Sequence, residues 1–176
     1  MPAPPTVKPF PDHMAIEQTE PWTLALASPS QTENFGSTIG RRLQKGEVIA
    51  LVGELGSGKT TFVRGVALGT GLDPHVVSSP TFTLIQEYFG PLTLAHVDLY
   101  RLKQSEELAD TGLAEYLNGD FVVLIEWADR MPDAWLPDDY LSIHFLHTGK
   151  NARRVQVQAI GPRSHGLLRA VMSDSR

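Results

Sequence analysis

The sequence predicts an α/β domain in which a mixed central sheet lies between two layers of helices. Two apolar runs, residues 48–52 and 121–125, have the composition of strands buried inside a sheet. Amphipathic helical patterns alternate with these runs, which is typical of parallel strands at the centre of a sheet. Pairs of strands near 84–99 and 140–160 are joined by short turns, so we expect antiparallel hairpins at the edges.

The first predicted strand covers residues 22–27, where apolar and polar residues alternate. Ser-Pro-Ser-Gln at residues 28–31 then has the pattern of a helix start, with a serine cap and proline in the first turn. Apolar residues every four positions give this helix one buried stripe: Phe35, Ile39 and Leu43. We expect the helix to end at Gly46, just before the strand at 48–52.

A second helix is predicted after residue 59, ending near the glycines at 69–71. Residues 84–88 and 92–99 follow as two strands joined across Gly90-Pro91. Ser105 opens a third predicted helix, whose buried side would hold four apolar residues: Leu108, Leu113, Tyr116 and Leu117.

The last part of the chain begins with a proline-containing loop at 128–139. A hairpin of strands near 140–146 and 154–160 follows, and residues 166–172 form a short terminal helix. In terms of organisation, we expect a disordered proline-rich tail over 1–20, one folded domain over 21–162, and a short C-terminal helix or tail over 163–176.

The composition narrows the classes of function. The chain has 176 residues, no cysteine and a net charge of −5, so disulfides and zinc-finger sites are excluded. No apolar run approaches the ~20 residues needed to span a bilayer, so we expect a cytoplasmic protein without membrane contact. Proteins that bind nucleic acid alone usually carry a basic face. Here residues 98–139 hold 11 acidic and 3 basic residues, which indicates a solvated face or a docking surface for a basic partner.

A glycine-rich turn lies between the strand at 48–52 and the second helix. Gly53, Gly58, Lys59 and Thr60 fit the pattern G-x-x-x-x-G-K-[ST] of the phosphate-binding loop. Backbone N–H groups of such a loop surround phosphate oxygens, and the helix N-terminus adds a positive dipole end. Lys59 would contact the β- and γ-phosphates, and the Thr60 hydroxyl would ligate Mg²⁺. The sequence therefore predicts a P-loop NTPase-like fold whose nucleotide-binding residues include Glu54, Leu55, Gly56, Ser57, Gly58, Lys59, Thr60 and Thr61.

Two carboxylates are candidates for the metal and catalytic roles that accompany a phosphate loop. Asp98 and Glu126 each follow an apolar strand, where an acidic residue can hold Mg²⁺ directly or through water. Glu126 follows the more continuous run, so we assign it to the metal and Asp98 to orienting the attacking water. The opposite assignment, or a capping or ion-paired role for either, stays open. Lys59 completes the predicted catalytic set.

Several polar or aromatic residues have two interpretations. Ser79, Thr81 and Thr83 could sense the γ-phosphate, or they could belong to an ordinary proline turn. Trp127 could border the nucleotide, although an aromatic at a strand end is more often part of the core. Arg153–Arg154 fits a solvated turn better than a phosphate clamp.

The nucleotide is expected to be ATP. The guanine-binding Asn/Thr-Lys-x-Asp motif of GTPases is missing from the sequence, and so is the signature of transporter ATPases. No isolated arginine stands out as a finger for the transition state, although Arg101 and Arg130 are candidates. Hydrolysis should therefore be slow and dependent on a partner.

Four segments together resemble one family: Gly53–Phe62 (GELGSGKTTF), Ser79–Leu84 (SPTFTL), Asp98–Leu102 (DLYRL) and Ile125–Trp127 (IEW). They are similar to TsaE, formerly YjeE, the small ATPase of bacterial tRNA threonylcarbamoyladenosine (t6A) synthesis. The resemblance covers roughly residues 24–160. The phosphate loop alone is generic, but these four motifs in this order are highly specific.

The resemblance implies an ATPase subunit that works with the proteins TsaD and TsaB. These transfer a threonylcarbamoyl group onto the tRNA adenosine immediately 3′ of the anticodon. TsaE does not perform the transfer, and it would meet tRNA only through the complex. The alternatives are a small-molecule or nucleoside kinase with the same loop, and a module that binds ATP only as a structural ligand. The acidic, arginine-poor stretch 103–139 argues against a kinase acting on a phosphorylated substrate.

The resemblance also implies roles for individual residues. The family's Mg²⁺ ligands fall on Thr60 and Glu126, and its essential acidic residue falls on Asp98. A tryptophan near the nucleotide falls on Trp127, and a threonine that borders the adenine falls on Thr32. Glu54 replaces an aspartate common in the family's loop, at a position where the phosphate-loop pattern is permissive.

Overall fold

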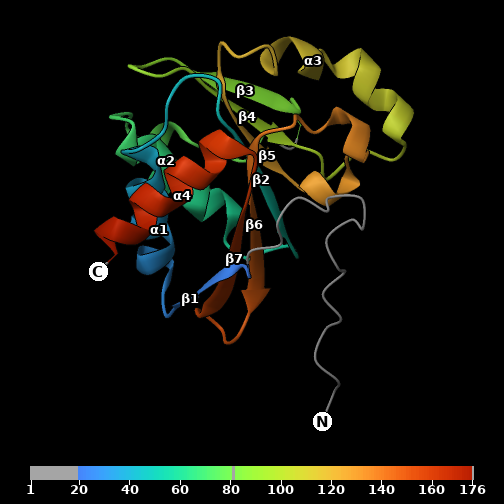
Figure 1. The fold of residues 1–176 in the computed structure, drawn as a ribbon. Helices are drawn as coiled ribbons and strands as arrows, with labels where there is room; N and C mark the ends of the chain where they lie inside the picture. Colours follow the sequence, from blue (N-terminus) through green and yellow to red (C-terminus); the bar gives the residue numbers. More distant parts are fainter. Residues whose placement is uncertain (1–19, 81, 176) are drawn as a thin grey trace.

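A computed structural model describes residues 20–80 and 82–175, and it has the expected three-layer α/β architecture (Figure 1). In Figure 1, the helices α1, α2 and α4 lie together on one side of the sheet, and the α3 segment lies on the other. The strands are β1 (Trp22–Leu26), β2 (Val48–Gly53), β3 (Ile85–Tyr88), β4 (Leu94–Asp98), β5 (Val122–Glu126), β6 (Tyr140–His147) and β7 (Arg153–Ile160). The α-helices are α1 (Pro29–Gly40), α2 (Lys59–Gly69), α3 (Leu113–Tyr116) and α4 (Pro162–Asp174), with short 3₁₀ helices η1 (Pro74–Val76), η2 (Ser105–Thr111), η3 (Ala128–Arg130) and η4 (Asp133–Trp135).

The sheet is mixed, and β2 lies at its centre. The strand order is β1-β7-β6-β2-β5-β4-β3. β2 pairs in parallel with both β5 and β6, and β4 pairs in parallel with β5. The pairs β3–β4, β6–β7 and β1–β7 are antiparallel. The prediction of a mixed sheet with antiparallel hairpins at its edges is therefore confirmed.

The strand β5 contributes side chains to both cores of the protein. Val122 and Leu124 pack in the core that includes residues of α1, α2 and α4, whereas Val123 and Ile125 pack in the core on the other face. This alternation follows from the two-residue period of a strand. It confirms the interpretation of the apolar run as a strand buried on both faces, and it directs Glu126 to the face covered by α1 and α2.

The helices α1 and α2 cross at close range because glycines line their contact. A Cβ atom at Gly65 would lie 2.0 Å from the carbonyl oxygen of Glu33, and one at Gly36 would lie 2.3 Å from that of Phe62. Gly40 and Gly69 are equally crowded, with backbone oxygens 2.4 and 2.3 Å from an added Cβ. Only hydrogen atoms fit at these positions, so the separation of the two helices is set by backbone contact.

Two of the predicted helices have different bounds in the structure. The helix α1 ends at Gly40, not Gly46, and the chain turns before it enters β2. Leu43 is still buried, so its spacing identified a core position beyond the end of the helix. The helix expected from Ser105 is divided into η2 and α3 by Gly112, whose φ of 75° lies in the left-handed region and interrupts helical hydrogen bonding.

The C-terminal helix α4 is longer than the predicted 166–172 and begins at Pro162. Its Leu167 and Val171 pack into the core beside α1. The tail expected over 1–20 lies outside the described residues except for Glu20, so that boundary stays a prediction. Across 20–80 and 82–175, none of the helices has the length and apolar character required to cross a membrane.

Candidate functional site

The loop between β2 and α2 has the backbone that a phosphate cradle requires. An added Cβ at Gly53 would lie 2.6 Å from Oγ of Ser57 and 2.9 Å from the carbonyl oxygen of Phe145, so only glycine fits there. Gly58 has a φ of 104°, in the left-handed region that favours glycine, and it directly precedes α2. The first turn of α2 therefore points its N–H groups toward the space enclosed by the loop.

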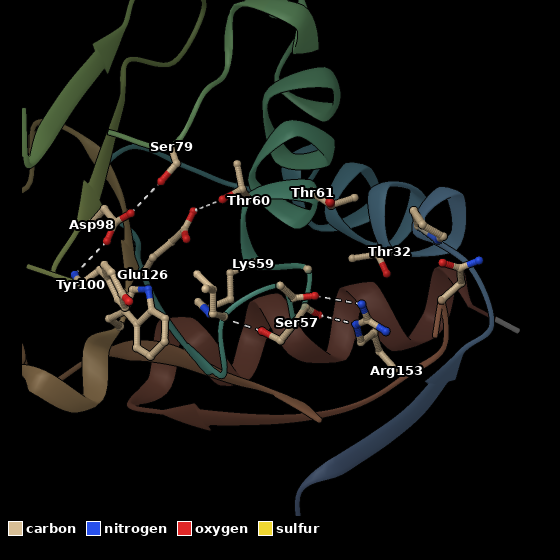
Figure 2. Close-up of a pocket in the computed structure, with 16 residues that line it drawn as sticks. Thr32, Ser57, Lys59, Thr60, Thr61, Ser79, Asp98, Tyr100, Glu126 and Arg153 are labelled. Atoms are coloured by element: carbon tan, nitrogen blue, oxygen red, sulfur yellow. Dashed lines mark hydrogen bonds between the residues drawn. The ribbon is translucent and has the colours of Figure 1, made fainter. Parts of the chain in front are cut away.

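A cavity of about 420 Å³ lies against this loop (Figure 2). Its walls come from the loop and the first turn of α2, the start of α1, the ends of β4 and β5, and the β6–β7 hairpin. The lining residues are Pro29, Thr32, Leu55, Gly56, Ser57, Gly58, Lys59, Thr60, Thr61, Ser79, Asp98, Tyr100, Glu126, Trp127, Asn151 and Arg153.

The fold brings nearly all of the predicted site residues to this cavity. Thr32, which only the resemblance indicated, lines it together with Asp98, Glu126 and Trp127. Glu54 is exposed and does not line the cavity, although its backbone carbonyl contacts Lys59. Of the three hydroxyl candidates after α2, Ser79 lines the cavity and Thr83 does not, while Thr81 lies outside the described residues.

The ammonium group of Lys59 is held at the base of the loop. Nζ donates to the carbonyl oxygens of Gly53 at 2.6 Å and Glu54 at 2.9 Å, and to Oγ of Ser57 at 3.3 Å. It also lies 4.2 Å from the ring centroid of Trp127. These contacts fix the cation in the cavity wall, within the loop that would surround an anion.

Burial sets the electrostatics of Lys59. The residue is only 4% exposed, and desolvation lowers its pKa from the ordinary value. The nearby carboxylates of Glu126 and Asp98 act in the opposite direction and favour the charged form. A phosphate group brought next to Nζ would add to that effect, because it supplies negative charge in a low-dielectric site.

Thr60 and Glu126 are in direct contact. The Thr60 hydroxyl donates to Oε1 of Glu126 at 2.9 Å, and Glu126 is only 3% exposed (Figure 2). A hydroxyl and a carboxylate side by side are oxygen donors that Mg²⁺ accepts, with substrate phosphates and water completing its shell. Within the described residues, no group of three or more His, Cys, Asp or Glu side chains could hold a metal ion by itself. The pair therefore fits a cation shared with a nucleotide.

Asp98 is tied to two neighbouring segments. Its Oδ2 accepts a hydrogen bond from the Ser79 hydroxyl at 2.7 Å, and its Oδ1 accepts one from the Tyr100 N–H at 2.8 Å. Asp98 is also the register partner of Glu126 across β4 and β5. The two candidate carboxylates thus end adjacent parallel strands, and Asp98 additionally connects to the segment that follows α2.

Trp127 lies between the cavity and the core. Its backbone is left-handed, with a φ of 59°, and its ring lies 5.0 Å from that of Tyr100. The side chain lines the cavity and also packs against the core on the α3 side. The guanidinium of Arg130 lies over the same two rings and donates to the backbone carbonyl of Leu102 at 3.3 Å. Arg130 does not line the cavity.

The position of Arg153 shows that the interpretation of residues 153–154 as a solvated turn was wrong for this residue. Its guanidinium donates from Nε to the carbonyl oxygen of Ser57 at 2.7 Å and from Nη2 to that of Gly56 at 2.9 Å, whereas Arg154 is exposed. No local pattern identifies this contact. It arises because β6 pairs with β2, with Gly53 opposite Phe145, so the β6–β7 hairpin ends beside the phosphate loop.

Comparison with known proteins gives a consistent result. A family model described as "Threonylcarbamoyl adenosine biosynthesis protein TsaE" matches residues 26–155. The tRNA threonylcarbamoyladenosine biosynthesis protein TsaE of Treponema pallidum is 40% identical over 130 residues, which are 74% of this chain and 95% of that protein. The protein of the same name from Bacillus subtilis is 39% identical over 137 residues, 77% of this chain and 84% of that protein.

A solved structure also matches. The crystal structure of YdiB from Bacillus subtilis aligns with a TM-score of 0.74 and 31% sequence identity. The alignment covers 89% of this chain and 97% of that one. The likeness therefore extends well beyond the phosphate loop and covers most of both chains.

Proposed function

The chain belongs to the TsaE family of threonylcarbamoyl adenosine biosynthesis proteins, and we propose that it is an ATP-binding, Mg²⁺-dependent ATPase of low intrinsic activity. In this proposal it supports the TsaB–TsaD complex, which transfers a threonylcarbamoyl group to the tRNA adenosine immediately 3′ of the anticodon. It acts in the cytoplasm, does not perform the transfer itself, and meets tRNA only through the complex. The observation that carries the proposal is the contact between Thr60 and Glu126 at a phosphate-loop cavity.

In this proposal, the residues around the cavity have separate roles in nucleotide binding and hydrolysis. The N–H groups of the loop and of the first turn of α2 bind phosphate oxygens, and Lys59 places its charge against the β- and γ-phosphates. Thr60 and Glu126 provide the protein oxygens for Mg²⁺, which would neutralise charge on the phosphates when bound. Asp98 accepts a hydrogen bond from the attacking water and orients it toward the γ-phosphate.

The placement of the arginines supports the proposal of low intrinsic turnover. Arg130 donates to backbone carbonyls, and Arg101 lies 4.2 Å from the ring of Phe82; neither lines the cavity. Arg153 does line it, but its guanidinium contacts the carbonyls of the phosphate loop. A cation for the transition state would then come from a partner protein, an arrangement worth about 10³–10⁵ in rate in other nucleotide hydrolases.

Reconstituted tRNA modification tests the proposal. TsaB, TsaD, tRNA and the enzyme that forms the threonylcarbamoyl adenylate are combined with or without this protein, and t6A is measured by nucleoside analysis. We expect multiple turnovers only when the protein is present, and loss of that effect in Lys59→Ala. Lys45→Ala is the matched control, because Lys45 is an exposed lysine that pairs with Asp120.

Two results would contradict the proposal. One is rapid ATP hydrolysis by the protein alone that the partners do not accelerate. The other is transfer of the γ-phosphate from ATP to a small acceptor instead of water, which would indicate a kinase.

A further inference from the structure

A buried histidine contacts the carboxylate that faces the phosphate loop. Nε2 of His96 lies 2.8 Å from Oε1 of Glu126, and the side chain of His96 is fully buried. No sequence pattern singled out this residue. Because Glu126 is a proposed Mg²⁺ ligand, the contact places His96 directly behind the metal site rather than in it.

The strand β4 explains how a histidine reaches this position. Leu94, His96 and Asp98 are alternate residues of one strand, so their side chains share the face covered by α1 and α2. Glu126 lies on the same face of the neighbouring strand β5, as the register partner of Asp98. His96 therefore precedes Asp98 by two residues on the same face of β4, within reach of the Glu126 carboxylate.

The hydrogen-bonding pattern of the ring points to one purpose. An ionised carboxylate can only accept hydrogen bonds, so the ring nitrogen Nε2 of His96 bears the hydrogen and donates to Glu126. The other ring nitrogen, Nδ1, is buried and has no hydrogen-bond partner among the described residues. A polar atom left unpaired in the interior costs stability. An aliphatic residue would fill this position without that cost, so the contact with Glu126 is what accounts for the histidine.

We propose that His96 is a positioning residue, which orients the Glu126 carboxylate for the Mg²⁺ of a bound nucleotide. This inference rests on the proposed function. Oε1 of Glu126 receives hydrogen bonds from two elements, from Thr60 on α2 and from His96 on β4. If the Thr60 hydroxyl served the cation, His96 would remain as the contact that keeps the carboxylate in place. Groups that orient metal ligands in this way typically change metal affinity about 10- to 100-fold when they are removed.

Three substitutions of His96 separate positioning from packing. The amide nitrogen of glutamine can occupy the place of Nε2, whereas that of asparagine reaches only the place of Nδ1, and leucine offers no donor. Binding of a fluorescent ATP analogue is measured over a range of Mg²⁺ concentrations and in EDTA. Thermal unfolding of each variant reports whether it folds.

We expect His96→Leu and His96→Asn to raise the Mg²⁺ concentration needed for half-maximal nucleotide binding by about 10- to 100-fold. His96→Gln should stay near the wild-type value, and all three should match wild type in EDTA. If His96→Leu fails to fold, the Gln and Asn variants still provide the comparison.

Other outcomes would overturn the inference. A wild-type Mg²⁺ requirement in His96→Leu or His96→Asn would show that the contact does not serve the cation. Equal losses in His96→Gln and His96→Asn, or unfolding of all three variants, would assign the histidine to packing alone. Wild-type protein that binds the analogue without any effect of Mg²⁺ would instead overturn the proposed function, which is a separate result.

Discussion

At the scale of single residues, the site is an arrangement of buried charge. Lys59, Asp98 and Glu126 are each less than 5% exposed. Lys59 donates hydrogen bonds to backbone carbonyls, and each carboxylate accepts at least one from a hydroxyl group. Buried charges are costly unless they are paired or hydrogen-bonded. The two carboxylates end adjacent parallel strands, so negative charge gathers at one wall of the cavity, where the proposed Mg²⁺ would lie.

The two carboxylates should be separable by amide substitution. Glu126→Gln removes the charge next to Thr60, so we expect the Mg²⁺-dependent affinity for ATP to fall by at least about tenfold, or 1.4 kcal/mol. Asp98→Asn should lower affinity less and the rate of hydrolysis more, because Asp98 is proposed to act on the attacking water. Titration with an ATP analogue and single-turnover hydrolysis measure the two effects. The opposite order of the affinities would exchange the two assigned roles.

The burial of His144 on β6 leads us to expect that the stability of the fold depends on pH. Burial lowers its pKa from the ordinary 6.5, and Asp129 only partly opposes this. Below about pH 6.5 the unfolded chain binds a proton more readily than the folded protein, so stability is lost as the pH falls through this range.

Replacing His144 should reduce that loss. We expect His144→Gln to show a smaller decrease in melting temperature than wild type between about pH 8 and 5. The control is His147→Gln, a change of the exposed histidine three residues along the same strand. An undiminished slope in His144→Gln would show that other groups cause the acid sensitivity.

At the scale of elements, local patterns predicted most of the fold and only part of the site. The phosphate loop and the strands β2 and β5 depend on residues that are adjacent in sequence, so their patterns were sufficient. Arg153 and His96 reach the site through strand pairing between distant segments, which no local pattern records. The break at Gly112 was missed because apolar spacing marks buried positions whether or not a helix is continuous.

The crossing of α1 and α2 gives a prediction about glycines. An alanine at Gly65 would place its Cβ 2.0 Å from the Glu33 carbonyl oxygen, so we expect Gly65→Ala to cost about 1–3 kcal/mol of stability. Gly166 in α4 has no atom within 4 Å of an added Cβ, and Gly166→Ala should stabilise the protein by about 0.5–1 kcal/mol. Urea denaturation measures both. Equal effects of the two substitutions would show that the helices can move apart freely.

At the scale of the whole molecule, the site lies where the carboxyl ends of parallel strands meet. β2, β4 and β5 all end at this edge of the sheet, and α1 and the β6–β7 hairpin close the cavity from the other side. The composition and the order of elements were enough to predict this architecture. The contacts that complete the site could not be predicted from local patterns, because they join residues from nearly the full length of the domain.

Nucleotide binding should therefore stabilise the entire domain. At an ATP concentration of about 100 Kd with Mg²⁺, mass action adds about 2.7 kcal/mol. For a chain of this size, that corresponds to a rise in melting temperature of about 5–10 °C. Lys59→Ala should lose the rise and Lys45→Ala should keep it, as measured by thermal unfolding. A rise of the same size in Lys59→Ala would contradict binding at the phosphate loop.

The glycine contact between α1 and α2 has a consequence for how mutations can alter this protein. α1 brings Pro29 and Thr32 to one wall of the cavity, and α2 brings Lys59, Thr60 and Thr61 to another. The glycines that keep the two helices close therefore also influence how near these two walls lie to one another. We expect a substitution at the crossing to change the affinity for the proposed nucleotide without altering any residue that lines the cavity.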